Sequence, residues 1–248
     1  MEIIKYFEGD KVKEALERYE RFAEERGWSL SHKLELYRAG NIAFSSSYSE
    51  DKRRENFETI YNSLKGYWGI FRPFTKGKVW ESPKVFDVLT KNCGACSRDS
   101  ILSLVNLKDE QSKAAISECL AKVKGIKSLK DDRFPTMAVS KFLHFFNPKL
   151  FPIYDNKVIK DKVLRIFKND WSDWKNSHAH IEPDYFKYIL WANYIIQQNH
   201  RGLMSEFVKW FAEQVEQKRN PGDLKNYYAT AFEFIAIGAS LIEEGNGT

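Results

Sequence analysis

The stretch at residues 134–158, FPTMAVSKFLHFFNPKLFPIYDNKV, most constrains what this chain can fold into, because its apolar residues are dense and its few polar residues are chemically reactive types. Pro135 and Thr136 predict a helix start, since proline fits a first turn and threonine can cap free amides. Asn147-Pro148 predicts its end. The apolar residues between these signals cover most of the helix circumference, so we expect the central helix of an α-helical core.

One narrow polar stripe remains on that predicted helix. Ser140, His144 and Asn147 fall on one side at spacing i, i+4 and i+7, and Lys141 lies one residue round. Beyond the helix, Asp155 stands where it can N-cap a second helix. A lysine beside hydrophobic walls loses solvation and becomes a candidate nucleophile, and a nearby carboxylate can handle protons or stabilise a cation. The alternative interpretation is structural: Lys141 reaches water with its amine, and Asp155 is only a cap.

The rest of the chain predicts a mainly α protein. Its 248 residues, 43% of them hydrophobic, suffice for one large domain or two small ones. Little β structure is expected, with a short irregular element near residues 40–50 or 150–154 and a polar loop over 170–181. Helical periodicity, read with caps and breakers, predicts helices over residues 10–26, 29–37, 50–64, 83–91, 97–106, 108–122, 156–167, 183–199, 203–218 and 223–243.

No stretch approaches the uninterrupted apolar length of a membrane span, and the N-terminus MEIIKYFEGD lacks the pattern of a signal peptide. Three cysteines, Cys93, Cys96 and Cys119, are too few for a disulfide scaffold and suit a reducing compartment. We therefore expect a cytoplasmic protein that does not associate with membranes.

Cys93 and Cys96 form a CxxC pair, which raises two alternatives. Zinc binding would need a second pair with metal-site spacing, and the sequence has none. A redox role would be typical of a thioredoxin-like βαβ pattern, which is also missing. His178 and His180 have no clear third ligand. We expect neither a metal nor another cofactor.

Positive charge collects around the central stretch. The net charge is only +5, but residues 113–168 hold 13 Lys and Arg against 5 Asp and Glu, so the rest of the chain is net negative. Such a local excess attracts polyanions, nucleic acid first, because each phosphate contact releases condensed counterions. The alternative is an ordinary solvated helix face.

Three segments in order resemble the helix-hairpin-helix DNA glycosylase superfamily. Val123-Lys124-Gly125-Ile126 looks like its hairpin, Ser140-Lys141 like the helix that carries its catalytic lysine, and residues 151–158, FPIYDNKV, like its proline-rich turn before an aspartate. The block SKFLHFFNPKLFPIYDNKV is similar to that of 8-oxoguanine DNA glycosylase-like proteins. The resemblance covers about residues 108–165.

The resemblance implies a multi-helix glycosylase core in one α-helical unit of residues 1–248, with 1–90 as an N-terminal helical subregion and 91–248 as the glycosylase-like part. Lys141 would attack the anomeric carbon of a damaged nucleotide, for example one that carries an oxidised purine, to form a Schiff base, with an associated lyase activity. Asp155 would assist departure of the base. The flipped base would enter a pocket near Ser140, His144 and Tyr154. Contacts to double-stranded DNA are expected from Lys122, Lys124, Gly125, Lys127, Lys130, Lys157 and Lys160. The alternative is a non-catalytic helical protein that binds nucleic acid or another protein.

Overall fold

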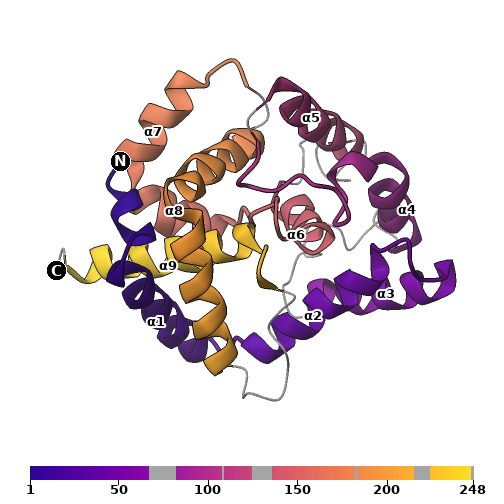
Figure 1. Ribbon diagram of the computed structural model, residues 1–248, viewed down its shortest axis with the longest axis horizontal. Helices are drawn as coiled ribbons and strands as arrows, with labels where there is room; N and C mark the ends of the chain where they lie inside the picture. The colour runs from indigo at the N-terminus through magenta and orange to yellow at the C-terminus, as the bar shows by residue number, and fades with distance from the viewer. Residues whose placement is uncertain (67–81, 108, 125–135, 182–183, 215–223, 247–248) are drawn as a thin grey trace. The chain divides into compact units, whose positions relative to one another are not determined.

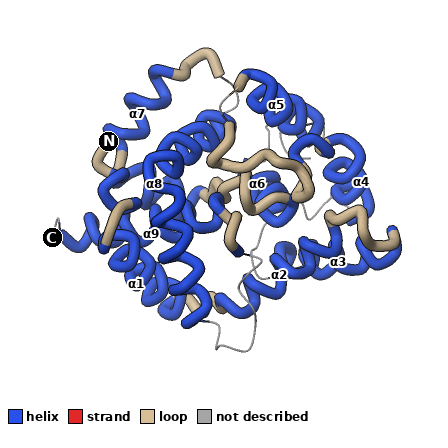
Figure 2. The backbone as a smooth tube through the Cα atoms, in the orientation of Figure 1, coloured by secondary structure: helices blue, strands red, loops and turns tan. Residues whose placement is uncertain are grey.

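The computed structural model confirms a mainly α protein (Figure 1). It describes residues 1–66, 82–107, 109–124, 136–181, 184–214 and 224–246. These residues form helices and loops without a strand (Figure 2), so neither expected β element is present. None of the helices described in these ranges combines the length and apolarity that a bilayer crossing needs.

The contacts within the chain define two compact units. Unit 1 comprises residues 1–31, 103–106 and 149–248, and unit 2 comprises residues 32–102 and 107–148. The organisation expected from the sequence, one α-helical unit with residues 1–90 as a subregion, stays a prediction.

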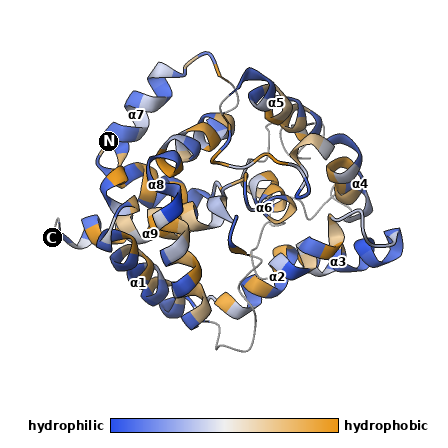
Figure 3. Cartoon of the chain, in the orientation of Figure 1, coloured by the Kyte–Doolittle hydropathy of each residue, from blue (hydrophilic) through white to orange (hydrophobic). Residues whose placement is uncertain are grey.

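Unit 1 is built around two helices that are distant in sequence. Helix α1 (Asp10–Glu25) packs along α9 (Tyr228–Asn246). Figure 3 shows hydrophilic and hydrophobic residues alternating along α1, as expected of an amphipathic helix. Among the residues that the structure describes, the remaining helices of this unit are the 3₁₀ helix η1 (Ile3–Phe7), the π-helix η4 (Asn156–Leu164), α7 (Lys168–Ser177) and α8 (Asp184–Gln214).

Helix α8 joins two predicted helices, which meet at a kink where Asn199 has non-helical angles, φ −150° and ψ 46°. Helix α7 replaces the first part of the polar loop predicted over residues 170–181, and only residues 178–181 form turns. Asp170 in its first turn is buried and accepts a hydrogen bond from the backbone N–H of Ile3 at 2.9 Å. Because the two residues are 167 positions apart in the sequence, a local sequence pattern could not reveal this contact.

Unit 2 encloses α6 (Thr136–Phe146), whose predicted span is confirmed. Its aromatic core joins Phe142 of α6 to Phe57 at a ring-centroid distance of 6.1 Å, and Phe146 to Phe44 at 5.0 Å. The surrounding helices are α2 (Leu30–Ala43), α3 (Glu50–Gly66), α4 (Ser82–Asn92), the 3₁₀ helix η3 (Gly94–Cys96) and α5 (Glu110–Lys124).

Two predictions in unit 2 are wrong. Helix α2 does not end at residue 37 as predicted but continues through Gly40 to Ala43, because a glycine there makes room for another segment: a Cβ at this position would lie 2.8 Å from the Phe145 carbonyl oxygen. Residues 97–106 form turns instead of a helix, since their polar groups are held by side chains from elsewhere, as described below.

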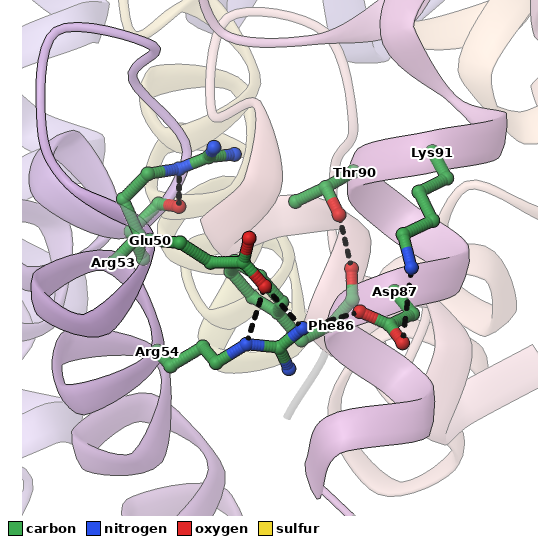
Figure 4. A network of polar contacts seen from close by, with 8 residues as sticks. Glu50, Arg53, Arg54, Phe86, Asp87, Thr90 and Lys91 are labelled. Carbon is green, nitrogen blue, oxygen red and sulfur yellow. Dashed lines mark hydrogen bonds and ion pairs between the residues drawn. The ribbon is translucent and has the colours of Figure 1, made fainter.

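Polar contacts fasten α3 to α4 at the surface of unit 2 (Figure 4). The guanidinium of Arg54 donates to Glu50 on its own helix at 2.7 Å and to Asp87 on α4 at 2.9 Å. It also lies 4.9 Å from the ring centroid of Phe86. Hydrogen bonds to the two carboxylates raise the pKa of Arg54. These contacts set the register of α3 on α4, while their partial exposure limits what they add to stability.

Gly238 tests the contact between α1 and α9. A Cβ at this position would overlap the carbonyl of Ala15, so Gly238→Ala should lower the free energy of unfolding by about 1–3 kcal/mol, despite the better helix propensity of alanine. Gly245→Ala, on the same helix with no atom within 4 Å of the added Cβ, is the matched control and should be neutral or slightly stabilising. Urea unfolding measures both; equal effects would contradict the close approach.

Candidate functional site

Lys141 lies inside unit 2. Helix α6 is buried along almost its whole length, and the lysine side chain belongs to that buried surface, with only 3% of the residue exposed. It does not extend into bulk solvent. Ser140 beside it is fully buried and its hydroxyl donates to the Met137 carbonyl of its own helix at 3.0 Å.

His144 pairs with a residue of α2. Its Nε2 lies 2.7 Å from the hydroxyl of Tyr37, and both residues are buried. One atom of this pair donates and the other accepts, depending on the tautomer of the imidazole. The contact links α6 to α2 one turn after Lys141.

The C-terminal end of α6 is held by a buried arginine. The guanidinium of Arg98 donates to the Phe145 carbonyl at 2.5 Å and to the Tyr37 carbonyl at 3.2 Å, and it also contacts the side chain of Asn41. The last carbonyls of a helix lack partners within it and carry partial negative charge, so a cation is well placed here. Gly40 makes room for this guanidinium.

Asn147, the last member of the polar stripe, ends the helix and is fully buried. Its side-chain amide donates to the carbonyls of Cys96 and Ser97, both at 3.1 Å, and to that of Leu102 at 3.4 Å. Residues 96–102 are therefore held by α6 instead of by a helical hydrogen-bond ladder. This explains why the predicted helix over residues 97–106 does not form.

Two of the cysteines are joined. Cys93, directly after α4, forms a disulfide with Cys119 of α5, with their Cα atoms 4.8 Å apart. Cys96 is a buried free thiol that donates to the Ala115 carbonyl at 3.4 Å. Burial, together with the charge of Glu118, raises the pKa of Cys96 to about 12. The CxxC pair is thus divided between a disulfide and an inert thiol, a pairing that its spacing did not predict.

Asp155 belongs to unit 1, and the predicted N-cap is confirmed. Its carboxylate accepts hydrogen bonds from the backbone N–H groups of Lys157 at 2.8 Å and Val158 at 3.1 Å. Its carbonyl accepts from both Ile159 and Lys160, the second of which is the i→i+5 contact of a π-helix. π-Helical hydrogen bonding is rare in proteins, and η4 keeps it over nine residues.

Tyr154, next to this cap, is buried among aromatic rings. Its ring centroid lies 5.0 Å from that of Tyr188 and 6.0 Å from that of Tyr185. The amine of Lys160 lies 5.0 Å from the same ring. Burial, followed by the negative charge of Asp184, raises the pKa of the Tyr154 hydroxyl to about 12. The phenol is therefore neutral at physiological pH and cannot serve as a base.

The predicted DNA-contacting residues have different surroundings. Lys157 and Lys160 are exposed on η4. Lys122 forms an ion pair with Glu118 on α5 at 2.6 Å, and Lys124 ends that helix. Gly125, Lys127 and Lys130, and with Gly125 the second half of the hairpin-like segment, lie outside the described residues.

The structure thus places the predicted site residues in both units. Lys141, Ser140 and His144 lie on one helix of unit 2, whereas Tyr154, Asp155, Lys157 and Lys160 follow one another in unit 1. A pocket near Ser140, His144 and Tyr154 stays a prediction. Two residues that position α6, Tyr37 and Arg98, were missed because their contacts join residues 47 to 107 positions apart and leave no local pattern.

No group of three or more His, Cys, Asp or Glu side chains in the described part of the chain could hold a metal ion. His178, considered as a ligand, instead stacks on Trp174 with ring centroids 4.1 Å apart, and its Nδ1 contacts the carbonyl of the same residue at 2.9 Å. Comparison of the chain with protein-family models, curated proteins and solved structures finds no significant match.

Two substitutions distinguish the capping role of the Asp155 side chain from a role of its negative charge. Asn is as good an N-cap as Asp, while Ala has no acceptor. We expect Asp155→Ala to lower the free energy of unfolding by about 1 kcal/mol and Asp155→Asn to leave it within a few tenths. Urea unfolding followed by circular dichroism measures both changes. Equal losses would show that the carboxylate acts through its charge and not as a cap.

Proposed function

We propose that this protein is a DNA glycosylase with an associated lyase activity, in which Lys141 is the nucleophile. The observation that carries the proposal is the position of Lys141, a lysine kept from bulk water on a helix whose buried residues are mostly apolar. The resemblance of residues 108–165 to the helix-hairpin-helix glycosylases supplies the reaction, since the structure alone would fit many uses of such a lysine.

In the proposed reaction, Nζ of Lys141 attacks the anomeric carbon of a damaged nucleotide, and the bond from that carbon to the base breaks. The base leaves with the bonding electrons and takes up one proton of the amine. The bond between the anomeric carbon and the ring oxygen then breaks, the oxygen becomes a hydroxyl with the second amine proton, and the carbon is left in a Schiff base to the lysine. Water excluded from the surroundings of the amine cannot hydrolyse this imine early. An oxidised purine is the substrate that the resemblance suggests.

Asp155 is proposed to stabilise the positive charge that develops on the sugar as the base departs. Its carboxylate already accepts two backbone hydrogen bonds at the start of η4, which fix its orientation. A carboxylate whose orientation is already fixed needs little reorganisation when positive charge develops on the sugar.

Lys157 and Lys160, in the first turns of η4, are proposed to contact backbone phosphates of the duplex. Both are exposed, and they follow Asp155 by two and five residues. Such contacts position DNA without reading its sequence. They would hold the duplex close to the carboxylate that acts on the damaged nucleotide.

A non-catalytic protein that binds nucleic acid is the second candidate. It is favoured by the same burial of Lys141, because a lysine that is 3% exposed must become reachable before it can attack a nucleotide. It shares the basic surface of η4 with the first candidate and differs from it only in the chemistry.

Borohydride trapping separates the two candidates. Duplexes that carry 8-oxoguanine, uracil or an abasic site are incubated with protein and reductant, and we expect a covalent adduct with wild-type protein that Lys141→Gln abolishes. The matched control is Lys33→Gln, which removes another buried lysine of unit 2 and should keep the adduct. Circular dichroism verifies that both variants fold. Binding without an adduct on any substrate would leave the non-catalytic candidate.

The phosphate contacts predict a salt dependence. Each phosphate contact adds about 0.9 to the slope of log affinity against log salt, so Lys157→Gln with Lys160→Gln should reduce that slope by about 2 and weaken binding to all sequences alike. Fluorescence anisotropy with a labelled duplex measures the slope. Lys13→Gln, an exposed lysine of α1, is the control and should leave it unchanged. An unchanged slope in the double variant would remove η4 from the DNA-binding surface.

A further inference from the structure

The Cys93–Cys119 disulfide is connected to α6 through a series of contacts between neighbouring residues. Cys93 follows the last residue of α4, and Cys119 lies in α5, so the bond joins the two helices. Three residues further on, the Cys96 thiol donates to Ala115, one turn before Cys119 on the same helix. Residues 93–96 are thereby fixed to α5 at two successive points.

The same short segment is fixed to α6 on its other side. The carbonyls of Cys96 and Ser97 accept the amide of Asn147, and the next residue, Arg98, donates to the carbonyl of Phe145. Residues 93–98 therefore connect α5 to the C-terminal end of α6 without an intervening flexible stretch. All of these residues belong to unit 2.

We propose that the Cys93–Cys119 pair is a redox-controlled clamp, which holds residues 93–98 against α6 when oxidised and loosens them when reduced. The clamp regulates the order of the helix that carries Lys141. It rests on the disulfide and the contacts of Asn147 and Arg98, and it holds whether or not Lys141 is a nucleophile.

The chemistry of the clamp is thiol–disulfide exchange with a low-molecular-weight disulfide, such as oxidised glutathione. One thiolate of the pair attacks that disulfide and expels one thiol, and the second thiolate then attacks the mixed disulfide and expels the other. The two cysteines lose two electrons and two protons, and the small disulfide becomes two thiols. Because Cys93 and Cys119 are both buried, exchange proceeds when α4 and α5 part locally.

Cys96 is excluded from the exchange by its surroundings. Its thiol is buried and engaged with the Ala115 carbonyl, and a thiol reacts only as a thiolate. Cys96 should therefore stay a free thiol in both redox states, while Cys93, three residues away, changes between thiol and disulfide.

Thiol counting tests the pairing. Protein equilibrated with oxidised glutathione, quenched in acid and denatured should show one free thiol per chain, and protein equilibrated with reduced dithiothreitol should show three. Peptide mapping of the oxidised form should find Cys93 linked to Cys119. Three thiols in the oxidised sample, or a Cys93–Cys96 link, would overturn the proposal.

Unfolding and hydrogen exchange test the clamp. A bond closing a loop of sequence separation 26 should raise the folding equilibrium constant on the order of 100-fold, so the reduced protein should unfold at lower urea. Cys119→Ser should abolish this redox difference and Cys96→Ser should retain it. Amides of residues 136–147 should exchange faster in reduced wild-type protein, a measurement that needs no variant. Equal exchange in both states would show that the disulfide does not control α6.

Discussion

The structure of unit 2 depends on the cost of burying polar groups along α6. A buried polar group without a hydrogen-bond partner costs about 1–3 kcal/mol, so each polar member of the stripe needs a complement. Tyr37 forms a hydrogen bond with His144, backbone carbonyls accept hydrogen bonds from Asn147, and Arg98 donates to a carbonyl at the end of the helix. The turns over residues 97–102, the close approach at Gly40 and the unbroken course of α2 all follow from those needs.

Features that depend on neighbouring residues were predictable from the sequence. The span of α6 and the N-cap at Asp155 were both predicted, because a capping side chain and the amides it serves lie within three residues of each other. Features that depend on distant residues were not predictable. Gly40 looks like a helix breaker until Arg98 is placed beside it, and the segment after Trp171 looks like a loop until Asp170 meets Ile3.

The difference between local and distant determinants also applies to the candidate site and to the distribution of charge. Lys141 and Asp155 are recognisable in the sequence as reactive residue types in an apolar stretch, but no local pattern points to Tyr37 and Arg98, whose contacts position α6. The count of basic residues was also incomplete as a guide, because Lys162 and Arg165 both pair with Glu244, which lies outside the basic segment. Linear charge therefore overstates the positive surface of η4, where Lys157 and Lys160 are the exposed lysines named for DNA contact.

The pairing of α1 with α9 has a consequence for synthesis on the ribosome. Unit 2 ends at residue 148 and can close its core once that residue has emerged. Unit 1 begins with the first residues of the chain but needs α9, about 100 residues later, which takes about 5–20 s at ordinary elongation rates. The apolar face of α1 stays uncovered by α9 throughout that interval. Helix α1 is thus made well before the helix that covers it, and its apolar face is among the last parts of unit 1 to be buried.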